Sequence, residues 1–464
     1  MNARRHAGQR AQETRHVGRR AVLGAGVVGV GAFAAWRVFG SEEEAGIPAP
    51  PERQPAWTYA MNGAAKGVTW LSSAGSTLYV TSETPLSVHA VDGGSGRGRW
   101  VAEVAGGEPV KAALGQVTVA GGTVYVAARG GYVHALADED GSRRWASAPQ
   151  GGGEPAAPVV IGSTVCALMR TEKVADTGGS SETLVEGVLC GLDAGTGRVK
   201  WRTEGNRLVL GDPSHGQVIA ETRDGERIVA LDADSGRERW SLPKQDSVVV
   251  PATGAKLMYA TGAGKANELA AYDLSTGRPR WKSPAPPKER ADGPGAHVTL
   301  SADGRTVYAC GGGDGGVYSY DAATGDRRWR ATVDAPVNPE VTPGGSAVFL
   351  VTSDAYQGAH SLDSGFRNPF SDGATEPDGY VVARAASDGK QLWRTPSETC
   401  TSAAALAGSG AVLVGHDAEL WAYDARTGAA RWRVKGEADA ERVPLVVGGR
   451  LYALTDAGVV AVPV

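Results

Sequence analysis

Eight near-copies of one eleven-residue motif run through the chain, and residues 230–240 (ALDADSGRERW) show it in full. The copies end at tryptophans that lie 45, 56, 39, 41, 48, 64 and 39 residues apart. These are Trp100, Trp145, Trp201, Trp240, Trp281, Trp329, Trp393 and Trp432. A period of about 40–45 residues is typical of propeller blades and exceeds that of most helical solenoid units. The repeat therefore predicts an all-β ring.

Each copy has the local chemistry of a strand, a tight turn and a returning strand. Alternating apolar residues before the Asp indicate a strand with one packed face. The Asp side chain can hydrogen-bond to the backbone of the turn, and Gly236 can adopt the left-handed conformation that closes it. The repeated Asp residues are thus predicted to form turns rather than to bind a ligand.

Two further apolar segments precede each copy. Before Trp145, residues 116–120, 123–128 and 132–136 are separated by glycine pairs. Together with the strand that carries the tryptophan, they make four strands, which is the content of one propeller blade.

The motif resembles the PQQ-type propeller repeat, AxDxxTGxxxW, which residues 271–281 (AYDLSTGRPRW) and 422–432 (AYDARTGAARW) match closely. The resemblance covers roughly residues 57–464 and implies a single propeller of four-stranded antiparallel blades, usually eight. It says little about function, because the same repeat serves quinoprotein dehydrogenases, BamB-type assembly scaffolds and propeller domains attached to bacterial kinases.

The repeat count itself indicates nine blades. Trp57 lacks preceding strands, whereas residues 443–464 contain three strand-like segments without a following tryptophan. We expect the two ends to share a closing blade, with the segment at Trp57 as its outermost strand, which would leave few exposed edges. Eight blades remain the expectation from the family and nine the expectation from the count.

The N-terminal region has the composition of an export signal. Residues 1–37 hold seven Arg and one Glu, or +6, so that −10 remains for the rest of a chain with a net charge of −4. The apolar run 21–36 follows Arg19 and Arg20, and the pair resembles a twin-arginine signal without the usual Phe. Residues 1–40 are therefore predicted to be an export signal, cleaved or retained as a membrane anchor, and residues 41–56 an extended Pro/Glu-rich linker outside the ring.

An acidic propeller without a basic stripe argues against nucleic-acid binding. Three long connections, residues 171–186, 283–295 and 353–379, are expected to emerge on one face of the ring. The last of these holds Tyr356, His360, Phe366, Arg367 and Phe370. Aromatic and Arg side chains are enriched in binding hot spots, so these five are candidate partner-binding residues.

Four cysteines are present, at positions 166, 190, 310 and 400. Cys166 and Cys190 fall at the places of Tyr125 and His134 in the preceding repeat, which we expect to face each other across a hairpin. A Cys166–Cys190 disulfide is therefore predicted for an exported protein, with two buried thiols as the alternative.

A quinoprotein enzyme would, as the resemblance implies, hold PQQ with an adjacent cysteine pair, Ca²⁺ ligands and a catalytic Asp. The chain has no adjacent cysteines, no C-x-x-C and no His cluster, so no PQQ, metal or catalytic site is predicted. We expect a monomeric, exported, non-catalytic scaffold that binds a protein or peptide on the face with the long connections. The alternatives are a PQQ-dependent dehydrogenase-like enzyme and a small-ligand sensor.

Overall fold

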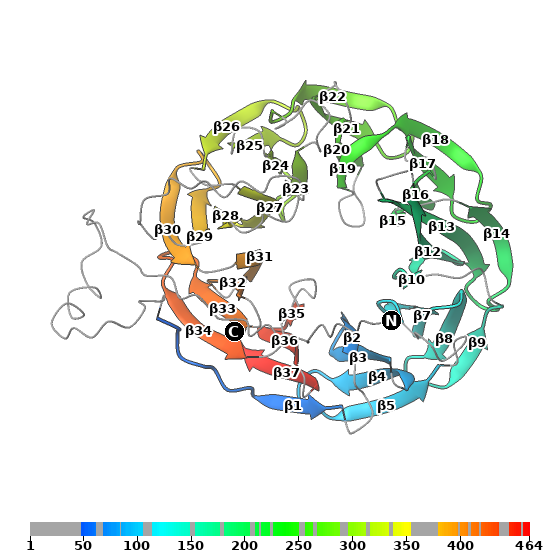
Figure 1. Ribbon diagram of the computed structural model, residues 1–464. Coiled ribbons are helices and arrows are strands. Elements are labelled where there is room, and N and C mark those ends of the chain that lie inside the picture. The colour runs from blue at the N-terminus through cyan, green and yellow to red at the C-terminus, as the bar shows by residue number, and fades with distance from the viewer. Residues whose placement is uncertain are drawn as a thin grey trace, which may run out of the picture.

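The computed structural model forms a closed ring of nine antiparallel sheets, eight of four strands and one of five, with the innermost strand of each sheet nearest the ring axis (Figure 1). It describes residues 48–61, 68–83, 85–104, 114–148, 154–176, 181–204, 209–212, 215–222, 226–249, 256–262, 267–287, 296–311, 316–333, 337–353, 379–397, 400–406, 410–416, 419–435, 445–455 and 458–464. These residues contain strands and no helix. The all-β propeller is confirmed, with the nine blades of the repeat count rather than the eight usual for the family.

The first eight blades run from the ring axis outward in sequence order. The first blade consists of β2 (Val68–Ala74), β3 (Thr77–Glu83), β4 (Leu86–Asp92) and β5 (Gly98–Glu103). The second consists of β6 (Thr118–Ala120), β7 (Thr123–Ala128), β8 (Tyr132–Ala137) and β9 (Arg143–Ala146).

The third blade has a divided innermost edge, because two short segments pair with the same strand. Its strands are β10 (Glu154–Pro155), β11 (Val159–Ile161), β12 (Thr164–Asp176), β13 (Ser181–Asp193) and β14 (Val199–Glu204). Most of the connection expected over residues 171–186 is an extension of the β12–β13 hairpin, which remains paired as far as Asp176 and Ser181.

The next three blades repeat the simple four-stranded order. The fourth is β15 (Val209–Asp212), β16 (Gln217–Glu221), β17 (Arg227–Asp232) and β18 (Glu238–Pro243). The fifth is β19 (Gln245–Val249), β20 (Leu257–Gly262), β21 (Glu268–Asp273) and β22 (Pro279–Pro284). The sixth is β23 (His297–Leu300), β24 (Thr306–Cys310), β25 (Gly316–Asp321) and β26 (Arg327–Thr332).

The seventh and eighth blades complete the sequence-continuous part of the ring. The seventh is β27 (Val337–Gly344), β28 (Ala347–Ser353), β29 (Gly379–Ala385) and β30 (Gln391–Ser397). The eighth is β31 (Cys400–Leu406), β32 (Ala411–His416), β33 (Glu419–Asp424) and β34 (Ala430–Lys435).

The ninth blade joins the two ends of the chain. Its strands are β35 (Leu445–Val447), β36 (Arg450–Thr455), β37 (Gly458–Pro463) and, outermost, β1 (Trp57–Ala60). Trp57 pairs with Ala461 and Ala60 with Gly458 in an antiparallel ladder. The predicted composite blade is therefore confirmed.

The core consists of nine apolar clusters, and each contains residues of two neighbouring blades. The two middle strands of a blade are buried on both faces because a neighbour covers each face, as in β17, where four consecutive residues are buried. Burial of apolar surface between the blades is thus what holds the ring together.

Candidate functional site

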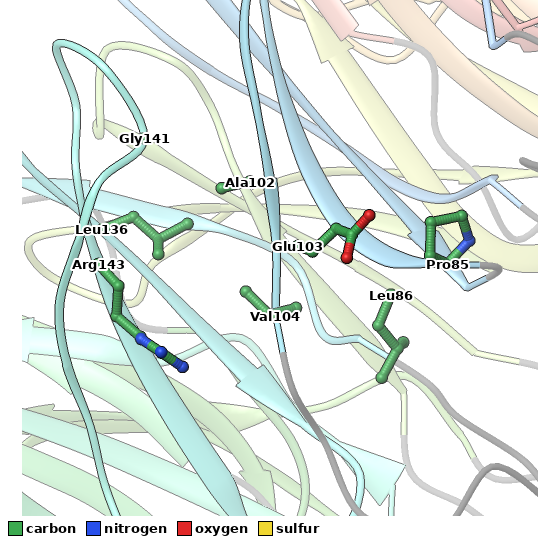
Figure 2. Close-up of a pocket in the computed structure, with 8 residues that line it drawn as sticks. All are labelled: Pro85, Leu86, Ala102, Glu103, Val104, Leu136, Gly141 and Arg143. Atoms are coloured by element: carbon green, nitrogen blue, oxygen red, sulfur yellow. The ribbon is translucent and has the colours of Figure 1, made fainter.

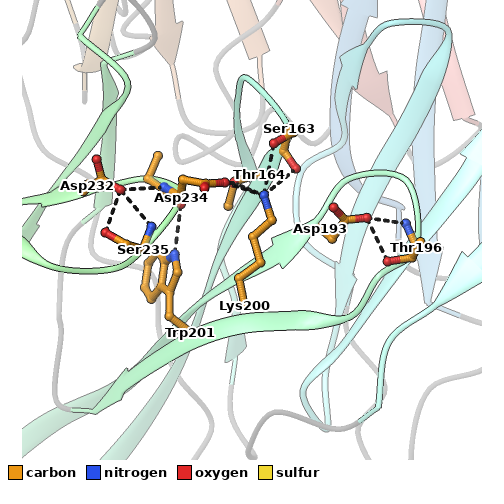
Figure 3. Close-up of polar contacts among 10 residues, drawn as sticks. Ser163, Thr164, Asp193, Thr196, Lys200, Trp201, Asp232, Asp234 and Ser235 are labelled. Carbon is orange, nitrogen blue, oxygen red and sulfur yellow. Dashed lines mark hydrogen bonds and ion pairs between the residues drawn. The ribbon is translucent and has the colours of Figure 1, made fainter.

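The repeated motif forms the joint between blades rather than a ligand site. Figure 3 shows Trp201 of the third blade, whose indole N–H donates a 2.9 Å hydrogen bond to the carbonyl of Ala233 in the fourth. The ring lies on Gly236, where an added Cβ would come within 2.6 Å of it. Gly236 also has a φ of 70°, so both the turn and the close approach require glycine.

The Asp of the motif closes its own turn. Asp232 accepts hydrogen bonds of 2.8 Å from both the amide and the hydroxyl of Ser235 (Figure 3), and Arg239 pairs with its other oxygen at 2.5 Å. The hydrogen bond from Arg239, followed by that from Ser235, lowers the pKa of Asp232 to about 2. The prediction that the repeated Asp is a turn former is confirmed.

The second, third and seventh blades depart from this Asp–Arg pairing. In the second, Ala137 stands at the place of the Asp, and Arg144 donates to the hydroxyl of Thr123 at 2.6 Å. In the third, Lys200 takes the place of the Arg and reaches Asp234 of the fourth blade at 2.5 Å and the hydroxyl of Thr164 at 3.0 Å (Figure 3). In the seventh, Ala385 and Leu392 replace the pair, and Leu392 is 52% exposed. The differences between copies thus alter the outer surface while the tryptophan joint persists.

A cleft of about 490 Å³ opens between the first and second blades. Its wall carries Pro85 and Leu86 on one side and Leu136 and Arg143 on the other (Figure 2). The lining is Pro85, Leu86, Ala102, Glu103, Val104, Leu136, Gly141 and Arg143. Six of these eight lining residues are uncharged, and two of them, Val104 and Leu136, are buried.

Ala102 accounts for the cleft. It lies two residues after Trp100, the tryptophan that contacts the second blade. At the matching position, other blades place a side chain that contacts the next blade. Ser283 donates to the carbonyl of Gly325 at 2.5 Å, and Thr395 donates to that of Gly428 at 2.7 Å. The methyl group of Ala102 neither fills this space nor supplies a donor for Gly141.

The same position is occupied in different ways elsewhere. Leu242 fills it with a buried side chain in the fourth blade. In the sixth blade it is again an alanine, Ala331, but there Arg384 of the seventh blade donates to the carbonyl of Gly389 at 2.9 Å. Among Ala102, Leu242 and Ala331, only Ala102 lines the cleft.

Two exposed charges border the cleft, Glu103 on β5 and Arg143 on β9. Neither side chain makes an ion pair or hydrogen bond in the part of the chain that the structure describes. The site therefore combines uncharged lining residues with one carboxylate and one guanidinium, neither of which is paired among the described residues. This is a common composition for a protein-contact surface.

Trp70 is a second surface feature, and the motif pattern of the sequence did not predict it. It lies on β2, the innermost strand of the first blade, and is 40% exposed. It also lies outside the docking position of the motif. The signal that could have identified it is that Trp70 does not end a copy of the repeat motif.

The predicted Cys166–Cys190 disulfide is wrong, because the register of the hairpin differs by one residue. Cys166 pairs with Gly191, and Cys190 pairs with Ala167. A one-residue shift places the two side chains on opposite faces of the sheet. Cys166 packs toward the fourth blade and Cys190 toward the second, and both thiols are free.

The prediction failed because it misplaced the centre of the hairpin turn in the second blade. Tyr125 pairs with Ala135 rather than with His134, because the hairpin is centred on Gly130. The two cysteines do occupy the places of Tyr125 and His134. Burial raises the pKa of the Cys166 thiol to about 12 and that of Cys190 to about 11.

Several predicted features lie outside the described residues. Among them are the partner-binding candidates Tyr356, His360, Phe366, Arg367 and Phe370, and the export segment of residues 1–40. No helix in the described ranges is long and apolar enough to cross a membrane. Within these ranges, no three His, Cys, Asp or Glu side chains gather as metal ligands.

Comparison with known families identifies the repeat. The family model described as outer membrane protein assembly factor BamB matches residues 41–185, 178–365 and 377–462, which is most of the chain. The chain belongs to the BamB family of PQQ-type propellers. The match includes residues of all nine blades.

Two characterised relatives share part of the chain. The serine/threonine-protein kinase AfsK of Streptomyces griseus is 28% identical over 306 residues, which cover 62% of this chain and 33% of the kinase. The outer membrane protein assembly factor BamB of Bordetella pertussis is 26% identical over 193 residues, 41% of this chain and 45% of that protein. The chain thus spans less than half the length of either relative.

Solved structures with similar folds include other members of the BamB family. BamB from Moraxella catarrhalis has a TM-score of 0.47 at 16% identity, covering 88% of this chain and 96% of that one. A quinohemoprotein alcohol dehydrogenase from Pseudomonas putida has the same TM-score at 15% identity, covering 87% and 71%. At TM-scores below 0.5, neither likeness bears on function.

Proposed function

We propose that this BamB-family propeller is a non-catalytic scaffold outside the cytoplasmic membrane that binds a partner protein. The observation that carries the proposal is the cleft between the first and second blades. The repeated Asp, Gly and Trp residues serve the joints between blades, so they leave little for chemistry. Function is then carried by what differs between copies, and Ala102 is such a difference.

The cleft fits an apolar side chain that a partner protein inserts between the two blades. Pro85, Leu86 and Ala102 supply apolar contacts. The charges of Glu103 and Arg143 at the border of the cleft match a basic and an acidic group on either side of that side chain. Val101, next to Ala102 on β5, is 56% exposed but does not line the cleft, because successive side chains of a strand point to opposite faces of the sheet. Apolar anchors surrounded by polar groups are typical of protein-binding hot spots.

The test is a substitution that fills the cleft with a side chain already used at the same place in the ring. Ala102→Leu copies Leu242, and Val101→Ser on the same strand is the control for a general change of surface. Partners captured by the full chain should be lost from Ala102→Leu and retained by Val101→Ser. Retention by Ala102→Leu would remove the cleft from the proposal.

The long connection of residues 353–379 is the second place to test. Replacing residues 354–378 with two glycines should leave the ring closed, because Ser353 and Gly379 already pair across β28 and β29. Loss of partners on this deletion would assign the binding to residues such as Tyr356, Phe366 and Arg367. An unchanged set of partners would leave this segment without a role in binding.

One observation favours the small-ligand alternative. The exposed ring of Trp70 on an innermost strand offers a flat surface on which a planar ligand or a sugar can stack. Thermal-shift measurements with sugars, and with PQQ plus Ca²⁺, test this on the wild type and on Trp70→Ala. Stoichiometric uptake of PQQ with alcohol-dependent dye reduction would overturn the scaffold proposal in favour of an enzyme.

A further inference from the structure

The closing blade differs from the others because its outermost strands, β37 and β1, are not consecutive in sequence. No motif turn joins them. In the eight other blades this turn places a glycine against the tryptophan of the preceding blade, where an added Cβ would come within 2.4–2.8 Å of the ring. The tryptophan that faces the closing blade therefore lacks its usual partner.

That tryptophan is Trp432 of the eighth blade. Among the described residues, no turn glycine reaches it. The guanidinium of Arg53 lies over its ring instead, 5.2 Å from the centroid. A cation over an indole face is attracted by the ring quadrupole, so Arg53 covers the face that a turn covers in the other blades.

The backbone around Arg53 is held on the same two blades. The amide of Arg53 donates to the carbonyl of Arg433 at 2.8 Å, and the amide of Arg433 donates to the carbonyl of Pro51 at 3.0 Å. The amide of Ala56 donates to Ala461 of β37 at 2.7 Å. Residues 50–56, here called the strap, thus lie along the ring edge rather than apart from it as the sequence predicted (Figure 1).

The other side of the closing blade is also unusual. Trp57 lies on Gly96 of the first blade, but its buried indole N–H finds no acceptor among the described residues. Seven other docking tryptophans make this bond at 2.8–3.1 Å. The carbonyl of Gly93, which corresponds to their acceptors, instead accepts from Tyr452 at 3.0 Å and from Arg450 at 2.9 Å.

We propose that the closing blade is the place where the ring opens, and that the strap is the latch that holds it shut. Arg53 and Arg450 replace the turn contact and the indole hydrogen bond that join the other blades. An arginine on a surface strap is more easily displaced than a glycine turn built into the blade. Release of the strap then uncovers Trp432 and the outer edge of β34 together.

Hydrogen–deuterium exchange on the full chain, resolved blade by blade, tests the latch. In the wild type, amides of β36 and β37 should exchange faster than those of the matching strands in the other blades. Arg53→Ala should speed their exchange by about tenfold or less, as expected for one cation–π contact, without changing the third to sixth blades. Arg53→Lys, which keeps a cation, should lie between the two.

The matched control is Arg330→Ala, because Arg330 lies 5.6 Å from the ring centroid of Tyr318 within the sixth blade. It should not alter exchange in the closing blade. Equal exchange of all blades in the wild type would overturn the proposal. So would an Arg53→Ala variant whose closing blade exchanges as in the wild type, or one in which all blades speed up alike.

Discussion

The indole N–H of Trp201 and the carbonyl of Ala233, 2.9 Å apart, join two blades through groups that lie 32 residues apart in the sequence. The same bond recurs from blade to blade, so the ring is a series of similar joints. Stability should therefore respond most strongly to changes at the glycine beneath each tryptophan.

Gly236→Ala should be strongly destabilising. Alanine at a φ of 70° is strained, and its Cβ would come within 2.6 Å of the Trp201 ring. Gly304 is the control, because it has the same φ of 70° but nothing within 4 Å of an added Cβ. We expect Gly304→Ala to cost about 1 kcal/mol and Gly236→Ala about 3 kcal/mol or more, by chemical denaturation. Equal losses would show that the ring contact contributes nothing.

Reducing agents should leave the stability of the protein unchanged. Cys166 and Cys190 are buried on opposite faces as free thiols with raised pKa values, so a thiol reagent should modify them only after unfolding. The measurement is the melting temperature with and without dithiothreitol, together with mass-spectrometric counting of labelled cysteines. A lower melting temperature on reduction would instead support the predicted Cys166–Cys190 disulfide.

The seam between the closing and first blades should weaken in mild acid. His89 accepts or donates a 3.0 Å hydrogen bond with Tyr59 of β1 and another with Ser87, and burial lowers its pKa below 6.5. Since the unfolded chain then binds the proton more readily, the stabilisation from neutral His89 is complete above about pH 6.5 and is lost as the pH falls below it.

The corresponding measurement is the unfolding free energy of the wild type and of His89→Gln between pH 8 and 5. The wild type should lose more stability than the variant on acidification. Parallel curves would mean that His89 does not titrate differently in the folded and unfolded chains.

Export should depend on the arginine pair near the N-terminus. Changing Arg19 and Arg20 to Lys should hold the full chain inside a host that has twin-arginine transport, because lysines keep the charge but not the guanidinium pair. The measurement is whether an added protease digests the protein in cells whose outer envelope has been opened while the cytoplasmic membrane stays intact. Export of the double variant at the wild-type level would instead indicate the general secretory route or a different signal.

The sequence predicted the features that depend on neighbouring residues. The Asp and Gly of residues 230–240 specify a turn wherever they occur, and the spacing of the tryptophans counts the nine blades. The composite closing blade followed from the same pattern, because Trp57 lacked strands and residues 443–464 lacked a tryptophan. The candidate site was not predicted, since Ala102 is informative only when compared with the side chains that cover the same place in other blades.

What the sequence alone determined is therefore the repeat, its turn chemistry and the order of strands within a blade, because these arise from contacts within about forty residues. Only the tertiary structure decided that Cys166 and Cys190 face apart, that a cleft opens beside Ala102 and that Arg53 covers Trp432. Each of these depends on hairpin register or on packing between blades, and a shift of one residue or the loss of one side chain changes the outcome.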